Sequence, residues 1–332
     1  MGVPVYVFDY PEAQAVAAAA GLRPDQLFVP CGSAVTGRPP PRALAGQPFV
    51  AINGSGHHHH ETMGLVAALV EADPDRRFTY VHVDAHPDTG ELYRWRYNCA
   101  SFVGRILESP SVDAAYLLGI NPEVLAEETQ RTVFFKNLHY YHCDYFAKLR
   151  QFTVRGGPID ETYFGPADGD LARAQKNPSV KQARLSEVTP PKHPEPLPAL
   201  VVKWRALSEF QPSTLPRLPL YLSVDLDVLK GSLVTDWRKS PKRSGPTRFG
   251  VPENQGEMSL ETLLELLTKL GEARPLLGAD VCGLTHELAA LSAEAREESL
   301  AANVQVVKLL LELVGAQRGA TARAGPGRRR SR

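Results

Sequence analysis

The stretch FTYVHVDAHPD, residues 78–88, decides how the rest of the chain is interpreted. It begins as an apolar strand and ends in Asp84, His86 and Asp88, which are spaced by two residues. On an extended strand, residues at this spacing point to one face. A carboxylate, an imidazole and a second carboxylate that converge at the end of a strand can hold a divalent metal ion.

A second acidic pair lies far along the chain, in YLSVDLDVL at residues 221–229. Asp225 and Asp227 are also two residues apart, and unpaired carboxylates on a buried strand are costly unless a cation neutralises them. A third cluster is the histidine run of INGSGHHHHETMGLV, residues 52–66. A run of histidines can be the remnant of an affinity tag. This run lies inside the chain, between an expected strand and the start of an expected helix, where a tag would not be placed. One of the histidines 57–60 can therefore project toward the crevice at the strand ends that carry the two acidic clusters.

Apolar strand patterns alternate with helical patterns over most of the chain. We expect strands at 3–8, 49–53, 78–85, 114–120, 132–137, 199–204, 220–226 and 276–283, and helices at 11–20, 62–72, 99–108, 122–130, 259–271 and about 287–315. Several strands are rich in Val and Leu on both faces. This alternation predicts an α/β fold with a mostly parallel sheet covered by helices. Sites in such sheets lie at the carboxyl ends of strands, where the three clusters fall.

The pattern predicts a single α/β catalytic domain over residues 1–315. Two stretches rich in Pro, Gly and charge, about 156–198 and 230–258, are too long for simple connections. Loops of that length are usually functional or disordered. The segment 316–332 contains six arginines and no acidic residue, and we expect it to be a disordered tail.

The composition limits the function classes. The formal net charge is zero and the pI is near 7.2, which argues against a nucleic-acid-binding or membrane-surface body. The N-terminus lacks the pattern of a signal peptide, and no uninterrupted apolar stretch approaches the ~18 residues of a membrane span. Four scattered cysteines without a CxxC pair indicate free thiols. We therefore expect a cytoplasmic protein with no nucleic-acid or membrane partner.

The order of the three clusters resembles the arginase/agmatinase (ureohydrolase) family of the arginase–deacetylase fold. DAHPD matches that family's Asp-Ala-His-x-Asp motif at every fixed position, and SVDLD matches its Ser-x-Asp-x-Asp motif. The family's Gly-Gly-Asp-His-Ser motif is matched in position only. Aligning the glycine that follows it with Gly64 selects His59 among the four histidines. The match in motif order covers about residues 48–285 and implies a three-layer αβα fold.

The resemblance also implies two Mn²⁺ ions that share a bridging hydroxide, which attacks a guanidinium carbon and releases urea or an amine. The ligands to one ion, bridging ones included, would be His59, Asp84, Asp88 and Asp227. Those to the other would be His86, Asp84, Asp225 and Asp227. Asp88 would also orient the hydroxide.

The sequence differs from the family motifs at three places, and we expect these differences to alter how the substrate is bound. Arginases have a proton-shuttle His where YNCASF has Ala100, and a guanidinium-binding Glu where GADVCGLTHE has Gly283. Arginases also follow the third motif with Asp-Pro, whereas this chain continues VLKGS. These features resemble an atypical branch that includes the peptide arginases, which convert arginine side chains of ribosomal peptides to ornithine. His286 and Glu287 are candidate catalytic residues that would replace the lost groups. An equally weighted alternative is that they belong to a helix N-terminal cap or form a surface pair.

The predicted function is therefore hydrolysis of a guanidino C–N bond in arginine, either free or within a peptide. One alternative is a metal-dependent amide hydrolase or deacetylase of the same fold, which would keep one metal and paired histidines. Another is an agmatinase-like guanidino hydrolase. A rival from a different class is a binding protein that keeps a relic of the metal site. The sequence leaves open whether the chain forms a homo-oligomer.

Overall fold

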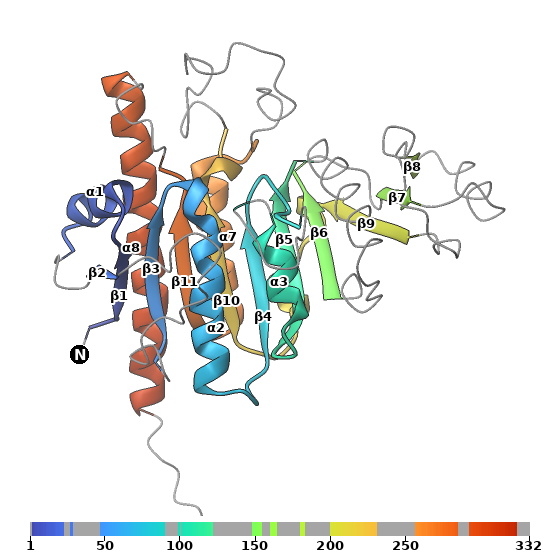
Figure 1. Ribbon diagram of the computed structural model, residues 1–332, viewed down its shortest axis with the longest axis horizontal. Helices are drawn as coiled ribbons and strands as arrows, with labels where there is room; N and C mark the ends of the chain where they lie inside the picture. The colour runs from blue at the N-terminus through green and yellow to red at the C-terminus, as the bar shows by residue number, and fades with distance from the viewer. Residues whose placement is uncertain are drawn as a thin grey trace, which may run out of the picture.

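The computed structural model describes residues 2–22, 27–28, 47–89, 99, 101–121, 148–154, 160–164, 180–182, 200–230, 256–284 and 292–323. Within these ranges one sheet runs through the molecule in the order β2-β1-β3-β11-β10-β4-β5-β6-β9-β7-β8 (Figure 1). Its central eight strands are all parallel: β1 (Val5–Phe8), β3 (Phe49–Gly54), β11 (Leu276–Cys282), β10 (Leu220–Asp225), β4 (Phe78–Val83), β5 (Val112–Ile120), β6 (Leu149–Thr153) and β9 (Leu200–Ala206). The short β2 (Leu27–Phe28) joins one edge in parallel. At the other edge β7 (Asp160–Phe164) runs antiparallel to β9, and β8 (Val180–Gln182) pairs with β7.

Helices cover both faces of this sheet. The helices α2 (Thr62–Ala72) and α3 (Phe102–Glu108) lie on one face, in front of the sheet in Figure 1. The helices α1 (Pro11–Ala19), α7 (Leu260–Ala273) and α8 (Ala293–Arg323) lie on the other. The predicted three-layer αβα class with a mostly parallel sheet is thereby confirmed.

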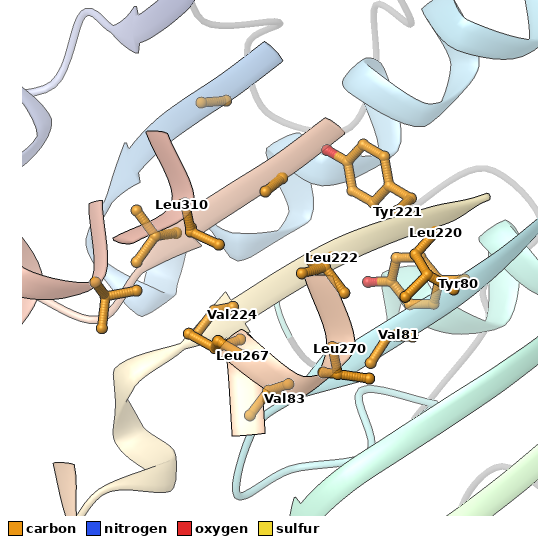
Figure 2. Packing of buried hydrophobic residues seen from close by; sticks show 14 of the residues in the cluster. Tyr80, Val81, Val83, Leu220, Tyr221, Leu222, Val224, Leu267, Leu270 and Leu310 are labelled. Carbon is orange, nitrogen blue, oxygen red and sulfur yellow. The ribbon is translucent and has the colours of Figure 1, made fainter. Parts of the chain in front are cut away.

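Alternation along the central strands separates an apolar face from a polar one. Leu222 and Val224 of β10 point to the side where Leu267 and Leu270 of α7 pack (Figure 2). Tyr221 directly precedes Leu222 in sequence and points to the opposite side (Figure 2). There its ring stacks on that of Tyr80 of β4, with ring centroids 6.1 Å apart. Because strand side chains alternate, the polar residues in step with these tyrosines also lie under α2.

The helix α8 is a core helix. Val306, Val307 and Leu310 are fully buried, and Leu310 faces the sheet in Figure 2. Within Ala293–Gln317 an 18-residue window has a mean hydropathy of 1.4, and by length and composition alone this helix would pass as a membrane-spanning one. Packing against α1, α7, β3 and β11 accounts for this apolar character without a membrane.

The C-terminal helix is longer than expected. It continues to Arg323, so residues 316–323 are helical rather than part of a disordered tail. Gln317 explains the extension, because its side chain accepts a hydrogen bond from the backbone N–H of Leu276 at 2.6 Å and donates one to the carbonyl of Gly271 at 3.1 Å. These bonds fix the helix to the start of β11 and the end of α7.

The expected strand at 132–137 and the expected helix at 122–130 lie outside the described residues. The expected loop at about 156–198 contains the short strands β7 and β8. The ends of the second long loop meet, because Leu229 pairs with Met258 and Lys230 with Gly256 in isolated bridges.

Candidate metal centre

The candidate ligands gather where four neighbouring strands end. The strands β3, β11, β10 and β4 are adjacent and parallel, so their carboxyl ends meet at one edge of the sheet. A 3₁₀ helix, η3 (Gly56–Glu61), follows β3 and carries His59. Asp84, His86 and Asp88 follow β4, whereas Asp225 is the last residue of β10.

Three carboxylates surround one nitrogen of His59. Its Nδ1 lies 3.1 Å from Asp84 Oδ2, 3.3 Å from Asp88 Oδ2 and 3.5 Å from Asp225 Oδ2. His59 is only 1% exposed, yet this Nδ1 makes no hydrogen bond. A buried polar atom without a partner is costly. A divalent cation among these atoms would remove that cost, so the donor set fits a metal ion.

A buried relay fixes the tautomer of His59. Its Nε2 lies 2.8 Å from the hydroxyl of Ser223, and that hydroxyl donates to Asp280 Oδ1 at 3.0 Å. Because the single hydroxyl proton goes to Asp280, Ser223 accepts from Nε2–H. In the neutral imidazole, the lone pair of Nδ1 therefore faces the carboxylates. Oriented imidazoles of this kind are typical of metal ligands.

A second group of ligands lies on the solvent side of Asp84. His86 Nδ1 is 2.7 Å from Asp227 Oδ2 and 3.4 Å from Asp84 Oδ1. The side chains of His86 and Asp227 are 32% and 28% exposed, so this group is open, whereas the His59 group is closed. Asp84 faces His59 with Oδ2 and His86 with Oδ1. It is thus placed to bridge two cations.

Burial and crowding of negative charge together set the pKa values of the carboxylates around the open group. Burial and then the neighbouring Asp225 and Asp84 raise the pKa of Asp227 to about 8. Burial and Asp84 also raise the pKa of Asp225. Without a cation, protons must therefore occupy part of this cluster near neutral pH. A divalent ion would displace them, since metal ligands bind deprotonated.

The backbone is shaped to hold these side chains. Asp88 has a φ of 47°, in the left-handed region that non-glycine residues rarely adopt. A Cβ at Gly56 would lie 2.7 Å from Asp225 Oδ2, and one at Gly283 would lie 2.9 Å from Asp225 Oδ1. Gly56 and Gly283 therefore leave the space that the Asp225 carboxylate occupies. This requirement accounts for the glycine that precedes the histidine run.

All six predicted metal ligands come together at this edge, and their role as ligands remains a prediction. Two details differ from expectation. The strand β4 ends at Val83, so Asp84, His86 and Asp88 converge through the turn after the strand and not on a strand face. Asp225, not Asp227, lies against His59. The predicted catalytic residues His286 and Glu287 lie outside the described residues, whereas Asp88 is in the His59 group.

Neighbours of His59 in the histidine run have other contacts. The ring of His58 stacks on Tyr10 with centroids 3.5 Å apart. Glu61 is buried and accepts a hydrogen bond from the Tyr10 hydroxyl at 2.7 Å. Among the four histidines, His59 is the one that lies in a described cluster of metal-ligating groups. The alignment with the family motif therefore selected the residue that the geometry favours.

Sequence reasoning missed His82, which joins His59, Asp84 and Asp88 in the closed group. Its Nε2 lies 3.1 Å from Asp84 Oδ2, and its Nδ1 lies 3.2 Å from the Tyr80 hydroxyl. Burial lowers the pKa of His82, so its neutral form is favoured. Its position two residues before Asp84 was the available signal, because alternation places it on the same strand face as Tyr80.

Sequence reasoning also missed Asp280, the carboxylate that accepts the hydrogen bonds of the buried network. Its Oδ1 accepts hydrogen bonds from Asn53 at 3.2 Å and from Thr62 at 2.9 Å, in addition to that from Ser223. Its Oδ2 accepts from Tyr221 at 2.7 Å. Burial raises its pKa to about 6. A lone Asp in the late strand gave no sequence signal for this role.

No protein-family model and no curated protein sequence matches the chain. Solved structures do match it. A hypothetical agmatinase from Burkholderia thailandensis superposes with a TM-score of 0.43 at 17% identity, over 82% of this chain and 60% of that one. Proclavaminate amidino hydrolase from Streptomyces clavuligerus gives 0.41 at 17% identity, over 91% and 69%. A T. brucei arginase-like protein, a triple mutant bound with Mn²⁺, gives 0.42 at 15% identity, over 81% and 62%.

The chain thus spans about 60% of the length of the agmatinase that it matches. Because the superpositions are partial, the fold class rests on the sheet topology described above. Fold and geometry together define an αβα protein with a His/Asp cluster, suited to divalent metal, at the carboxyl edge of its sheet.

Proposed function

We propose that the chain is a metal-dependent hydrolase that cleaves a guanidino C–N bond and releases urea. The observation that carries the proposal is the position of Asp84. One of its oxygens faces the closed His59 group and the other faces the open His86 group. A carboxylate shared in this way suits two ions, for which we propose Mn²⁺. Two bound ions would polarise a water molecule and make it nucleophilic at neutral pH.

The protein residues would divide the remaining tasks. The closed group excludes bulk water, because His59 and His82 are buried and Asp88 is 6% exposed on its side chain. The open group, with His86 and Asp227, is the side from which a substrate would approach. Asp88 faces the interior of the centre, where it would orient the attacking water and accept its proton.

For the substrate we propose arginine, either free or as a side chain of a peptide, with ornithine as the product. Gly283 supports an altered substrate grip. A Cβ there would meet Leu226 N at 2.6 Å as well as Asp225, so the position leaves no space for a guanidinium-binding side chain. We further propose a cytoplasmic enzyme that acts on a guanidino substrate, with no nucleic-acid or membrane partner.

A second candidate is amide hydrolysis, as in the deacetylases. One observation favours it: the rings of His59 and His82 stack with centroids 5.0 Å apart, which gives the closed group a pair of histidines. Such a pair suits acid–base catalysis beside a single metal. The open group around His86 favours two ions instead, and for that reason guanidino hydrolysis is our first proposal.

Urea release from the protein loaded with Mn²⁺ tests these alternatives. The substrates are free arginine, agmatine, an arginine-containing peptide and, for the amide reaction, an acetyl-lysine peptide. Asp225→Asn is the inactive control. Urea from any guanidino substrate that is lost in the variant supports the proposal, and the best substrate defines the branch. Acetate release without urea would favour the amide hydrolase. Bound metal without turnover of any substrate would favour a binding protein.

A further inference from the structure

Cys282 lies beside the closed His59 group of the candidate centre. We call this side of the centre the closed end, and the side with His86 and Asp227 the open end. Cys282 is the last residue of β11, and it pairs in register with Asp225 of β10. The side chain is fully buried. Its sulfur, one nitrogen of His59 and one carboxylate oxygen of Asp225 all lie within 4.8 Å of one another. A thiol, an imidazole and a carboxylate at this separation are close enough to share one ion.

A second observation independently points to a ligand. His59 Nδ1 is buried, makes no hydrogen bond, and is aimed into the cluster that Asp225 also faces. The other ring nitrogen is occupied by Ser223 and cannot relieve it. A buried nitrogen that makes no hydrogen bond, on a residue close to a buried thiol, is a donor set that suits one divalent ion.

We propose that Cys282 supplies a thiolate ligand to the ion held beside His59. The closed end then offers nitrogen, sulfur and oxygen, while the open end with His86 and Asp227 offers nitrogen and oxygen alone. Soft thiolate ligands select ions such as Zn²⁺, whereas carboxylate-rich sites suit Mn²⁺. The two ends would therefore prefer different ions. The inference rests on the proposed function only in requiring a metal centre, and it does not depend on the substrate.

Ligation requires a balanced proton transfer. The S–H bond of Cys282 breaks, a sulfur–metal bond forms, and the proton is released to solvent as the ion enters. No oxidant or reductant is involved. A buried cysteine often serves only as a small apolar side chain, and such a cysteine would give no sulfur signature on a bound metal.

The test uses the full chain loaded with Co²⁺, which reports its ligands by absorption. A thiolate ligand gives an intense sulfur-to-cobalt charge-transfer band in the near ultraviolet. We expect this band in the wild type and its loss in Cys282→Ser. Cys99→Ser is the matched control and should keep the band, because Cys99 does not belong to the described metal-ligating groups. Circular dichroism and cobalt content are measured on each variant.

X-ray absorption of the wild-type protein loaded with Zn²⁺ needs no variant, and it should show a sulfur shell at about 2.3 Å. Bound metal without a sulfur signature would overturn the proposal, as would a charge-transfer band that survives Cys282→Ser. A wild-type chain that binds neither ion would overturn it as well. Urea release without a sulfur signature would contradict this inference alone. A sulfur signature without urea release would leave it intact and count against guanidino hydrolysis.

Discussion

His59 Nε2 lies 2.8 Å from the hydroxyl of Ser223, and through that hydroxyl the imidazole is linked to the fully buried carboxylate of Asp280. The link determines which ring nitrogen faces the acidic cluster. It also crosses the sheet, because His59 follows β3, Ser223 belongs to β10 and Asp280 belongs to β11. The orientation of the His59 ring is therefore fixed by hydrogen bonds to residues of two central strands.

Ser223→Ala is expected to weaken metal binding by about 10–100-fold, the usual effect of removing a partner that orients a ligand. The change leaves His59 Nε2 unpaired and its tautomer unfixed. Thr62→Val is the control, because the Thr62 hydroxyl donates to the same oxygen of Asp280 at 2.9 Å. Thr62 contacts His59 through its backbone N–H, which donates to the His59 carbonyl and which valine keeps. Calorimetric titration of both variants with Mn²⁺ measures the difference. Equal affinities in the two variants would refute the role given to Ser223.

Gly56→Ala is expected to reduce metal binding at the closed end while the chain still folds. Its new Cβ would lie 2.7 Å from Asp225 Oδ2, so the carboxylate must move away from His59. Gly315→Ala in α8 is the control, because a Cβ at Gly315 would meet only the side chain of Val3, at an ordinary distance of 3.4 Å. Metal content and circular dichroism of both variants decide the matter. Unchanged metal content in Gly56→Ala would show that Asp225 is not a ligand.

Removal of single carboxylates should change the metal stoichiometry in a graded way. Asp84→Asn is expected to lose both ions, because its two oxygens face His59 and His86 separately. Asp88→Asn is expected to lose only the ion of the closed end, and Asp227→Asn only that of the open end. Elemental analysis after dialysis counts the ions per chain. Retention of both ions by Asp84→Asn would disprove the bridging position.

The metal-free protein is expected to lose stability as the pH rises from about 6.5 to about 8. Asp227 has a pKa raised from 3.8 to about 8 by burial, Asp225 and Asp84. The folded state thus holds a proton that the unfolded chain has already released, and stability falls as the pH rises through the folded pKa. His86 acts in the same direction, because Asp227 and Asp84 outweigh burial and raise its pKa well above 6.5.

Other buried histidines also titrate near this window. Burial lowers the pKa of His59, but Cys282, Asp84 and Asp88 outweigh it and raise that pKa well above 6.5, so His59 acts in the same direction as Asp227. Burial lowers the pKa of His60, so His60 acts in the opposite direction.

The pKa of His82 is lowered from 6.5 by burial, so its opposing contribution fades as the unfolded chain loses its proton, within about one pH unit above 6.5. The pKa of Asp280 is raised only to about 6, so its contribution largely ends below the window. Urea denaturation at pH 6.5 and pH 8 measures the change, and saturating Mn²⁺ should abolish or reverse it. Metal-free stability that rises between these two values would contradict the charge crowding.

The fold was largely predictable because its signals are local and repeated. Runs of Val and Leu mark the strands from Phe78 and Leu220, and their burial on both faces fits a parallel sheet under two helix layers. Strand order was not predictable. The insertion of β10 and β11 between β3 and β4 depends on contacts between segments far apart in sequence. The extent of α8 depends on Gln317, whose bonds to Leu276 and Gly271 have no local signature.

The site was predictable where its spacing is short, as in Asp84-x-His86-x-Asp88. The explanation offered for that spacing was wrong, because these residues converge through a turn in which Asp88 adopts a positive φ. Residues that act across strands were missed or left open. The network of Asp280 and the position of Cys282 become visible only when β11 is placed beside β10.

Anomalous diffraction from crystals of the full chain grown with Mn²⁺ tests the central claim most directly, because it locates each ion without reference to a substrate. We predict two peaks, one among His59, Asp88 and Asp225 and the other beside His86 and Asp227, with Asp84 in contact with both. A single peak, peaks away from Asp84, or no peak at all would contradict the binuclear centre.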